Sequence, residues 1–429
     1  MRPFFLFIPV IKLVNQIKMK TENRSVSIFN IAVIVASLGY FVDIYDLLLF
    51  TIVRVPSLKS LGLPQSEIDA GAGMLLINVQ MVGLLIGGIF WGIIGDKKGR
   101  LSVLFGSILI YSVANIANGF VHSINGYVLW RFVAGFGLAG ELGAGITLVS
   151  EILPKEKRGY GTMIVATVGV SGAVAANLIA KLVGDWRICY FIGGGLGLAL
   201  LILRVSVMES HLFNAVRESS ASRGSFIALF TNKERFLKYL KCMLLGTPTW
   251  FVVGILIAFS NKFAAVMNVK GAISPGDAVA FCYAGLVLGD FTTGLISQLW
   301  QSRRKVMLLF LVLTGVMVTV YLNLHGAETW VFYTVCFILG FSVGFWAIFV
   351  TIAAESFGTN LRATVATTVP NFARGMLPLI SLLFIKVQNY YTFLQSGAIV
   401  AVVCIGIALI TAWKVEETFG KDLNYLEEI

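Results

Sequence analysis

The stretch RFVAGFGLAGELGAGITLVSEILPKEKRG, which runs from Arg131 to Gly159, decides how the rest of the chain is understood. It is mostly apolar and long enough to cross a bilayer as a helix, yet it contains Arg131 and Glu141. A charge inside a membrane helix is costly, and its default interpretation is a functional one. Glycines between positions 135 and 145 would let neighbouring helices approach closely. The stretch therefore predicts a tightly packed helix on a transport path. The alternative is that Arg131 only caps backbone carbonyls of a neighbouring helix.

The composition is that of a helical membrane protein. Of the 429 residues, 57% are hydrophobic and only 13% are charged, whereas a soluble domain averages about 25% charged residues. The apolar segments are about 20 residues long or longer, which exceeds the roughly ten-residue strands of an outer-membrane barrel. The net charge of +11 is better explained by the position of the basic residues along the chain than by nucleic-acid binding. We expect an all-α integral membrane protein without a nucleic-acid partner.

The residues that usually carry chemistry are scattered. The five cysteines fall inside apolar segments, and none of the three histidines has a nearby Cys or His partner. This spacing indicates no disulfide framework, metal site or cofactor. No nucleophile–base set and no phosphate-binding loop is found either. We therefore expect that the chain is not an enzyme.

Twelve apolar segments are predicted to span the membrane as helices. They lie at about 28–53, 70–95, 101–122, 126–153, 161–184, 188–208, 242–261, 277–301, 306–325, 329–356, 363–388 and 393–413. We divide the chain into an N-terminal segment (1–27), a six-helix bundle (28–208), a polar linker (209–241), a second six-helix bundle (242–413) and a tail (414–429). Residues 1–18 hold an apolar run that is too short to span, and no signal-peptide cleavage site follows it. They form either an interfacial helix or an extension upstream of a start at Met19.

The basic residues predict the orientation. Most of the 33 Lys and Arg residues fall in segments that lie on one side if both termini are cytoplasmic. Cytoplasmic loops of membrane proteins carry this excess. We expect a multi-pass plasma-membrane protein with both termini in the cytoplasm. No Asn-x-Ser/Thr site lies in a predicted outer loop, which is consistent with a bacterial inner membrane.

The two halves of the chain repeat each other. GLLIGGIFWGII, which starts at Gly83, aligns with GLVLGDFTTGLI, which starts at Gly285. Glu151 and Arg158 recur with the same spacing as Glu355 and Arg362. Duplicated six-helix halves are a transporter architecture, with the substrate held between them near the middle of the bilayer.

The segment Gly92-Ile-Ile-Gly95-Asp96-Lys97-Lys98-Gly99-Arg100 resembles the signature loop of the major facilitator superfamily. The resemblance implies that fold and a secondary transporter. Asp96 at a helix end would pair with a base on a neighbouring helix in one transport state and lose it in the other. The alternative is a cytoplasmic turn with ordinary basic residues. We call the expected contact of Asp96 the latch. The second copy has Gln298 in place of Asp96, so the latch should be weaker in the C-terminal half. The expected latch residues are Gly92, Asp96, Lys97, Gly99, Arg100, Glu151, Arg158, Glu355 and Arg362.

Further motifs narrow the resemblance. The opening stretch is similar to the fourth helix of proton-coupled symporters, the metabolite–proton symporters in particular. Asp43-Ile-Tyr-Asp46 resembles the Asp-Gly-Tyr-Asp of aromatic-acid symporters, except that Ile44 replaces glycine. Trp186-Arg187 and Glu209-Ser210-His211-Leu212-Phe213 also match usual family positions. The resemblance covers nearly the whole chain, and it is specific for the fold rather than for the substrate.

Four residues are candidates for proton coupling: Asp43, Asp46, Arg131 and Glu141. Asp46 and Arg131 lie at a similar depth in their helices and are opposite in charge. Asp43 and Asp46 share one helix face, and two carboxylates so close do not both ionise easily. Arg131 would then compete with a proton for Asp46. The alternative is a static buried ion pair.

The second half lacks the charges of the first. By the repeat alignment it has Cys336 where the first half has Arg131, and Trp346 where it has Glu141. Arg374 could clamp a substrate carboxylate with its planar fork, or it could pair with Asp290; both remain open. The candidates for substrate binding are Tyr45, Trp250, Asp290, Trp346, Asn371 and Arg374.

The preferred function is proton-coupled import of a small organic acid or zwitterion, by a monomer in contact with lipid. One alternative is an efflux antiporter. Drug antiporters carry a Gly-Pro pair on the fifth helix, but here that helix reads VGVSGAVAANLIA. Another alternative is a membrane sensor, although a linker of about 33 residues leaves no room for a large output domain.

Overall fold

The computed structural model describes residues 27–427, apart from 65–66, 69–71 and 205–223. The prediction for residues 1–18 and the motif Glu209–Phe213 lie outside the described residues. Twelve helices are long and apolar enough to cross a membrane in the described part of the chain, so the twelve-helix prediction is confirmed.

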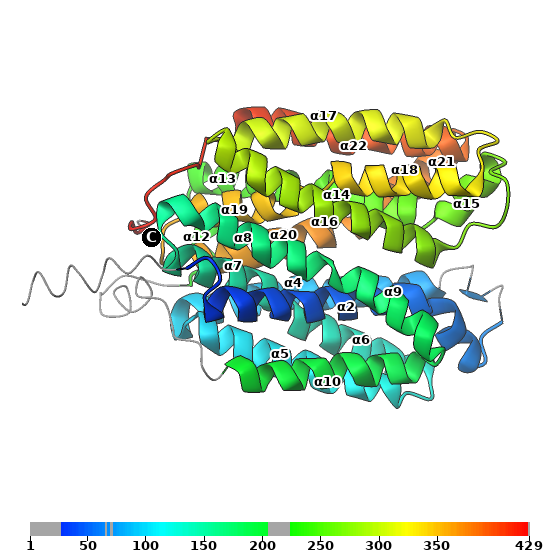
Figure 1. The fold of residues 1–429 in the computed structure, drawn as a ribbon, viewed down its shortest axis with the longest axis horizontal. Helices are drawn as coiled ribbons and strands as arrows, with labels where there is room; N and C mark the ends of the chain where they lie inside the picture. Colours follow the sequence, from blue (N-terminus) through cyan, green and yellow to red (C-terminus); the bar gives the residue numbers. More distant parts are fainter. Residues whose placement is uncertain (1–26, 65–66, 69–71, 205–223, 428–429) are drawn as a thin grey trace, which may run out of the picture.

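The N-terminal half holds six spans, which lie side by side along the long axis of the molecule (Figure 1). They are α2 (Ile31–Ser60), α4 (Gly73–Lys98), α5 (Arg100–Gly119), α6 with α7 (Ile124–Leu138 and Glu141–Ile152), α8 with α9 (Lys155–Val170 and Gly172–Val183) and α10 (Trp186–Arg204).

The C-terminal half repeats this arrangement. After the short α12 (Ala228–Thr231) come α13 (Lys233–Leu244), α14 (Thr247–Phe251), the π-helix η2 (Val252–Ile257), α15 (Ser260–Val266), α16 (Pro275–Leu299), α17 (Arg303–Leu322), α18 with α19 (Thr329–Ser342 and Trp346–Glu355), α20 with α21 (Arg362–Gly375 and Leu377–Gln388) and α22 (Phe393–Lys414). α12 and most of α13 lie inside the stretch that we assigned to the linker, so the seventh span begins earlier than predicted, at Lys233.

The repeated glycine motif has the same packing role in both halves. A Cβ at Gly83 in α4 would collide with the backbone of Phe132 in α6, and a Cβ at Gly285 in α16 would collide with Phe337 in α18. Only glycine lets two helices approach so closely. The motif therefore sets the distance between one pair of helices in each half.

Two spans are interrupted at matching positions. α6 gives way to α7 at Ala139 and Gly140, and α18 gives way to α19 at Val343 to Phe345. A break inside the membrane frees backbone groups, which is tolerated where they are buried in protein. At the second break, Asp290 of α16 accepts the backbone N–H of Ala347 at 3.0 Å. The breaks thus expose backbone donors and acceptors near the middle of the bundle.

The two halves form two layers that pack against each other (Figure 1). α5 and α10 form the outer edge of one half, and α17 and α22 form the outer edge of the other. The start of α2 and the C-terminus lie at the same end of the bundle. We call this the latch end because it carries the loop from Gly92 to Arg100.

Candidate functional site

The latch end joins the two halves through Asp96. Its carboxylate, at the end of α4, accepts the backbone N–H of Ala363 at 3.0 Å and that of Thr364 at 2.8 Å. These groups belong to the first turn of α20, whose N–H groups have no partner within the helix and carry partial positive charge. Arg100 lies 3.4 Å from Asp96 in the same buried cluster. Asp96 therefore acts as an anionic cap on a helix of the other half.

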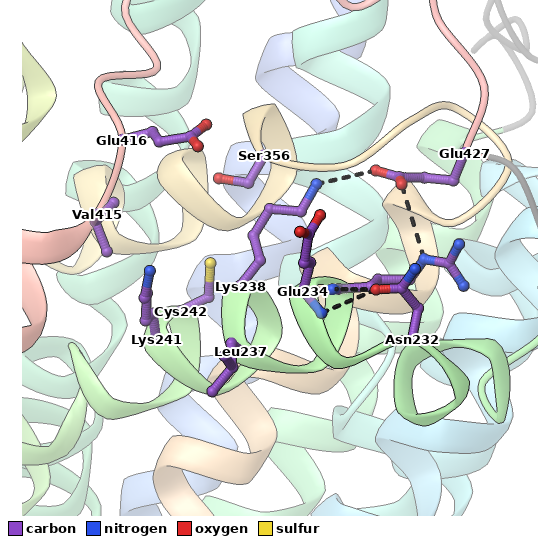
Figure 2. Close-up of a pocket in the computed structure, with 11 residues that line it drawn as sticks. Asn232, Glu234, Leu237, Lys238, Lys241, Cys242, Ser356, Val415, Glu416 and Glu427 are labelled. Atoms are coloured by element: carbon purple, nitrogen blue, oxygen red, sulfur yellow. Dashed lines mark hydrogen bonds and ion pairs between the residues drawn. The ribbon is translucent and has the colours of Figure 1, made fainter.

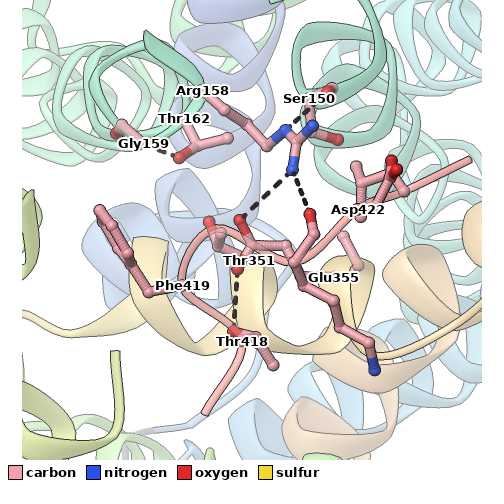
Figure 3. A network of polar contacts seen from close by, with 12 residues as sticks. Ser150, Arg158, Gly159, Thr162, Thr351, Glu355, Thr418, Phe419 and Asp422 are labelled. Atoms are coloured by element: carbon pink, nitrogen blue, oxygen red, sulfur yellow. Dashed lines mark hydrogen bonds and ion pairs between the residues drawn. The ribbon is translucent and has the colours of Figure 1, made fainter. Parts of the chain in front are cut away.

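The repeated Glu and Arg residues pair across the halves. Glu151 accepts Arg362 at 3.0 Å, and Glu355 lies 4.0 Å from Arg158. Each arginine also donates to a carbonyl of its own half, Arg158 to Ser150 and Arg362 to Ala354. Figure 3 shows Arg158 between Ser150 and Glu355. The internal duplication thus produces a reciprocal pair of buried ion pairs.

The remaining latch residues have simpler surroundings. Gly99 has a φ of 103°, which favours glycine, and a Cβ at Gly92 would lie 2.9 Å from Cα of Thr364. Lys97 is exposed. Glycine is therefore used for a turn at one position and for close contact between the halves at the other.

The C-terminal tail is part of this network, which sequence reasoning missed. The Thr418 hydroxyl donates to Glu355 at 2.8 Å, and Arg362 donates to the carbonyl of Leu423 at 2.6 Å (Figure 3 shows Thr418). Arg158 reaches the carbonyl of Lys421 at 3.4 Å. The tail consequently touches an arginine from each half. The only signal in the sequence is an isolated leucine, Leu423, among polar residues, and it is 1% exposed.

A cavity of about 500 Å³ lies beside the tail, between it and α13 (Figure 2). Its charges largely pair with each other, since Glu427 lies 3.2 Å from Lys238 and 3.8 Å from Arg235. The cavity does not include any residue that we predict to bind substrate. We therefore look for the substrate site between the two halves.

Asp43 and Asp46 on α2 are both fully buried. Among the described residues, only the amide of Asn115 comes near enough to Asp46 to interact with its carboxylate, and none donates a hydrogen bond to Asp43. Asp46 faces α10, because a Cβ at Gly193 would collide with its Oδ1. Asp46 is thus enclosed inside the N-terminal half, and neither carboxylate has an ion-pair partner in the described part of the chain.

Arg131 on α6 is bound to neutral groups. It donates to Gln80 and, at 3.4 Å, to the hydroxyl of Tyr190. Its guanidinium lies 5.0 Å from the ring centre of Phe50. Within the described chain it forms no ion pair with Asp46, although the charge of Arg131 acts on that carboxylate. The static ion pair that we considered as an alternative is not observed.

Glu141 belongs to a different cluster. It forms a buried ion pair with Arg204 of α10, with one contact at 3.0 Å, and accepts the hydroxyl of Ser107 at 2.6 Å. Sequence reasoning missed Arg204, which lies near the end of the sixth predicted span (188–208) and has no marked partner in the spacing of the residues. Glu141 is therefore separate from Arg131.

In the C-terminal half, Arg374 on α20 lies between two tryptophans. Its guanidinium is 5.9 Å from the Trp250 ring and 5.8 Å from the Trp346 ring, and it donates to Asn371 at 3.2 Å. Asn371 in turn donates to the carbonyl of Ala139 at the break between α6 and α7. In the described part of the chain, Arg374 forms no ion pair with a carboxylate. Of the two interpretations of Arg374, pairing with Asp290 is not observed.

Arg374 and both tryptophans line a small central cavity of about 20 Å³ between the halves. Its other lining residues are Tyr40, Ile44, Leu47, Val170, Thr249, Tyr283 and Leu286. The indole N–H groups of Trp250 and Trp346, Nε of Arg374 and the hydroxyl of Thr249 have no hydrogen-bond partner among the described residues. All four groups are potential donors. Tyr45 does not line this cavity; it donates to the carbonyl of Cys189 in α10.

The cavity is too small for a metabolite, since its volume corresponds to roughly one water molecule. At the end opposite the latch, Lys181 of α9 forms an exposed ion pair with Asp277 of α16 across the halves. A substrate therefore needs the two halves to move apart around this site.

This arrangement is matched by known proteins. Residues 25–376 match the family described as the Major Facilitator Superfamily. The chain belongs to the major facilitator superfamily. The resemblance noted from the sequence is thereby confirmed, and the protein is a membrane transporter of this superfamily.

Individual relatives agree with this assignment. A Haemophilus influenzae protein that carries the name of a metabolite transport protein is 25% identical over 413 residues, which cover 92% of this chain and 97% of that protein. The sialic acid transporter NanX of Escherichia coli is 26% identical over 280 residues, which cover 61% of this chain and 67% of that one. The solved structure of the proton:xylose symporter XylE has a TM-score of 0.72 and 15% identity, covers 92% of this chain and 98% of its own, and shows the same fold.

Proposed function

We propose that this major facilitator protein is a proton-coupled symporter of a small organic acid. The observation that carries the proposal is the pair Asp43 and Asp46, buried without an ion-pair partner in the described part of the chain, beside an Arg131 that is bound to neutral groups. An ionised carboxylate is too costly to bury alone, so it takes up a proton or acquires a cation. Asp46 would hold a proton in the state described here and release it when Arg131 leaves Gln80 and Tyr190.

The substrate class is inferred from the donors around the central cavity. Arg374 and the indole groups of Trp250 and Trp346 offer N–H donors. Such a set favours an anion with acceptor oxygens, and a guanidinium binds a carboxylate with two parallel bonds. The flanking indole rings favour a flat or apolar body next to that carboxylate. A relative named for sialic acid transport is consistent with an acidic substrate.

The latch end would close the route to the cytoplasm in this state. We place it on the cytoplasmic side because most Lys and Arg residues lie there. We further propose that the protein acts as a monomer in a bacterial inner membrane. Opening the latch end and closing the opposite end would complete one half of the cycle.

The test has two steps. First, purified protein is screened by thermal shift against carboxylates such as benzoate and sialic acid, amino acids and sugars. Second, the best ligand is followed into proteoliposomes with and without an inwardly directed proton gradient. Accumulation that depends on the gradient supports symport. Accumulation only under an outwardly directed gradient indicates an antiporter, and binding without any flux indicates a sensor.

Asp46→Asn tests the coupling site. This variant mimics the protonated carboxyl permanently, so we expect it to lose gradient-driven accumulation while it still exchanges substrate in counterflow. Asp43→Asn is the neighbouring control, and we expect a milder effect from it. Equal loss of accumulation and counterflow in Asp46→Asn would mean that Asp46 binds substrate or supports the fold instead.

A further inference from the structure

A stripe of polar side chains follows the buried face of α5. Ser107, Tyr111, Asn115 and Asn118 are spaced four, four and three residues apart, which places them on one face of the helix. All four are fully buried. At 1.5 Å per residue the stripe extends over about 16 Å along the membrane span. Polar groups inside the bilayer are costly and by default functional.

The stripe connects two carboxylates that otherwise belong to different clusters. At one end, Ser107 donates to Glu141 at 2.6 Å. Farther along, the stripe passes Asp46, next to which the amide of Asn115 lies. On α10, a Cβ at Gly193 would meet Asp46, and a Cβ one turn later, at Gly197, would meet Ser112 and Tyr111, so these groups lie within about one helical turn of each other.

Four side chains on or beside the stripe need partners that the described residues do not provide in full. The hydroxyls of Tyr111 and Ser112 and the amide of Asn118 have no hydrogen bond to any described residue, and the amide of Asn115 has only the nearby carboxylate of Asp46. Buried polar groups are almost always hydrogen-bonded, and water provides the bond where protein does not. The neighbouring α10 packs closely here, since a Cβ at Gly197 would collide with Ser112. Single bound waters are therefore expected beside the unsatisfied groups, bridging one to the next.

The other half of the molecule provides an internal comparison. α17 stands where α5 stands, at the outer edge of its half (Figure 1). By the repeat alignment its residues at the four stripe positions are Phe310, Thr314, Val318 and Tyr321. Two of these are apolar, and the other two are satisfied: Thr314 donates to the carbonyl of Ser342 at 2.9 Å and Tyr321 to that of Leu256 at 2.8 Å. The outer-edge helix of this fold thus does not require unsatisfied polar side chains at these positions, because α17 has none there, whereas α5 does have them.

We infer that this stripe is a proton relay between Asp46 and Glu141. The hydroxyls of Tyr111 and Ser112 each accept one proton as they give up their own, and Asn115 holds an intervening water beside Asp46. One proton leaves Asp46 as its carboxylate forms, and one arrives at Glu141, whose ion pair with Arg204 then breaks. The protein neither gains nor loses a proton in this transfer. The inference rests on the proposed proton coupling and adds a route through the interior of the N-terminal half, away from the substrate cavity.

The test follows the proton itself. Purified protein is taken through a pH step, and the infrared carbonyl stretch of protonated Asp46, assigned by its loss in Asp46→Asn, is recorded over time. Tyr111→Phe removes only a hydroxyl, and Asn115→Leu replaces an amide by an apolar group of similar size. We expect each to slow the change at Asp46 at least about tenfold. Ser112→Ala is a third variant in case either of these fails to fold.

Tyr321→Phe is the matched control, because it removes a buried hydroxyl from the corresponding helix of the other half. We expect it to lower thermal stability and to leave the rate at Asp46 unchanged. Equal rates in the wild type and in all three α5 variants would overturn the relay and leave symport standing. An Asp46 signal that never responds to pH would overturn both the relay and the coupling role of Asp46, while gradient-driven uptake reports on symport separately.

Discussion

The contact of Asp96 with the first turn of α20 allows one substitution to be worked out in detail. Asp96→Asn keeps the shape of the side chain but replaces one acceptor oxygen by an NH₂ group. Asp96 accepts two backbone N–H groups, from Ala363 and Thr364, so the amide would leave one of them facing another donor. An unsatisfied buried donor costs about 1–3 kcal/mol. Loss of the negative charge at a helix N-terminus adds about 0.3–2 kcal/mol.

The sum is about 3 kcal/mol against the closed latch, which shifts the equilibrium between closed and open latch end roughly 10²-fold. We expect substrate affinity to change little because Asp96 is distant in the fold from the central cavity and does not line it. The transport cycle should slow because the latch must close again in each turn. Lys98 and Arg304 are exposed positions of the latch end in different halves. Double electron–electron resonance between spin labels on Lys98→Cys and Arg304→Cys measures the populations of the closed and the open latch end.

Glu328→Gln is the control, since it also converts a carboxylate into an amide but at an exposed ion pair with Lys270. We expect its label distances to equal those of the parent protein. If Asp96→Asn also keeps the parent distances and the parent counterflow rate, the reasoning about the helix cap is refuted.

Three other predictions follow from the same network and site. Arg374→Lys keeps the charge but loses the planar fork, so carboxylate binding measured by calorimetry should weaken by about 1–3 kcal/mol, and unchanged affinity would indicate a structural arginine. Glu141→Gln leaves Arg204 buried without its counter-charge and should lower the free energy of unfolding by roughly 3–5 kcal/mol, whereas Glu141→Gln with Arg204→Gln should recover most of the loss; thermal unfolding compares the two. Protonation of Glu417 at acid pH should release the tail. Burial raises the pKa of Glu417, but hydrogen bonds from Ser302 and from backbone N–H groups outweigh burial and hold the pKa below its usual range. A lowered pKa stabilises the bound tail above the ordinary pKa, and this stabilisation is lost as the pH falls through the lowered value. The protection factors of residues 415–427, which are corrected for the intrinsic pH dependence of amide exchange, should therefore fall there and stay constant in Glu417→Gln.

The fold was predictable because its determinants are local and repeated. Each span shows itself as an apolar run, and the paired motifs at Gly83 and Gly285 gave the duplication without any structure. The residues of the reciprocal ion pairs were found from the same repeat, in which Glu151 corresponds to Glu355 and Arg158 to Arg362; the structure adds that each glutamate pairs with the arginine of the other half.

The partners of the buried charges were not predictable in the same way. Position along a helix gives depth, at 1.5 Å per residue, so Asp46 and Arg131 were expected at the same level. Contact also requires that both side chains point at each other, and this depends on the rotation and packing of their helices. Arg131 turns toward Gln80 and Tyr190, and Glu141 turns toward Arg204. None of these pairings has a signal in the spacing of the residues.

The division of labour between the halves has a consequence for coupling. Among the described residues, Asp43 and Asp46 of the N-terminal half and Arg374 of the C-terminal half form no ion pair. Arg374 lines the central cavity between the halves, whereas Asp46 faces α10 inside its own half. Charge separated in this way is costly in a medium of low dielectric constant. A proton on the carboxylate relieves one side and an anionic substrate on Arg374 relieves the other, so the closed state is least costly when both are bound. A transporter that can close only when loaded with both ligands moves them together, which is the physical requirement for symport.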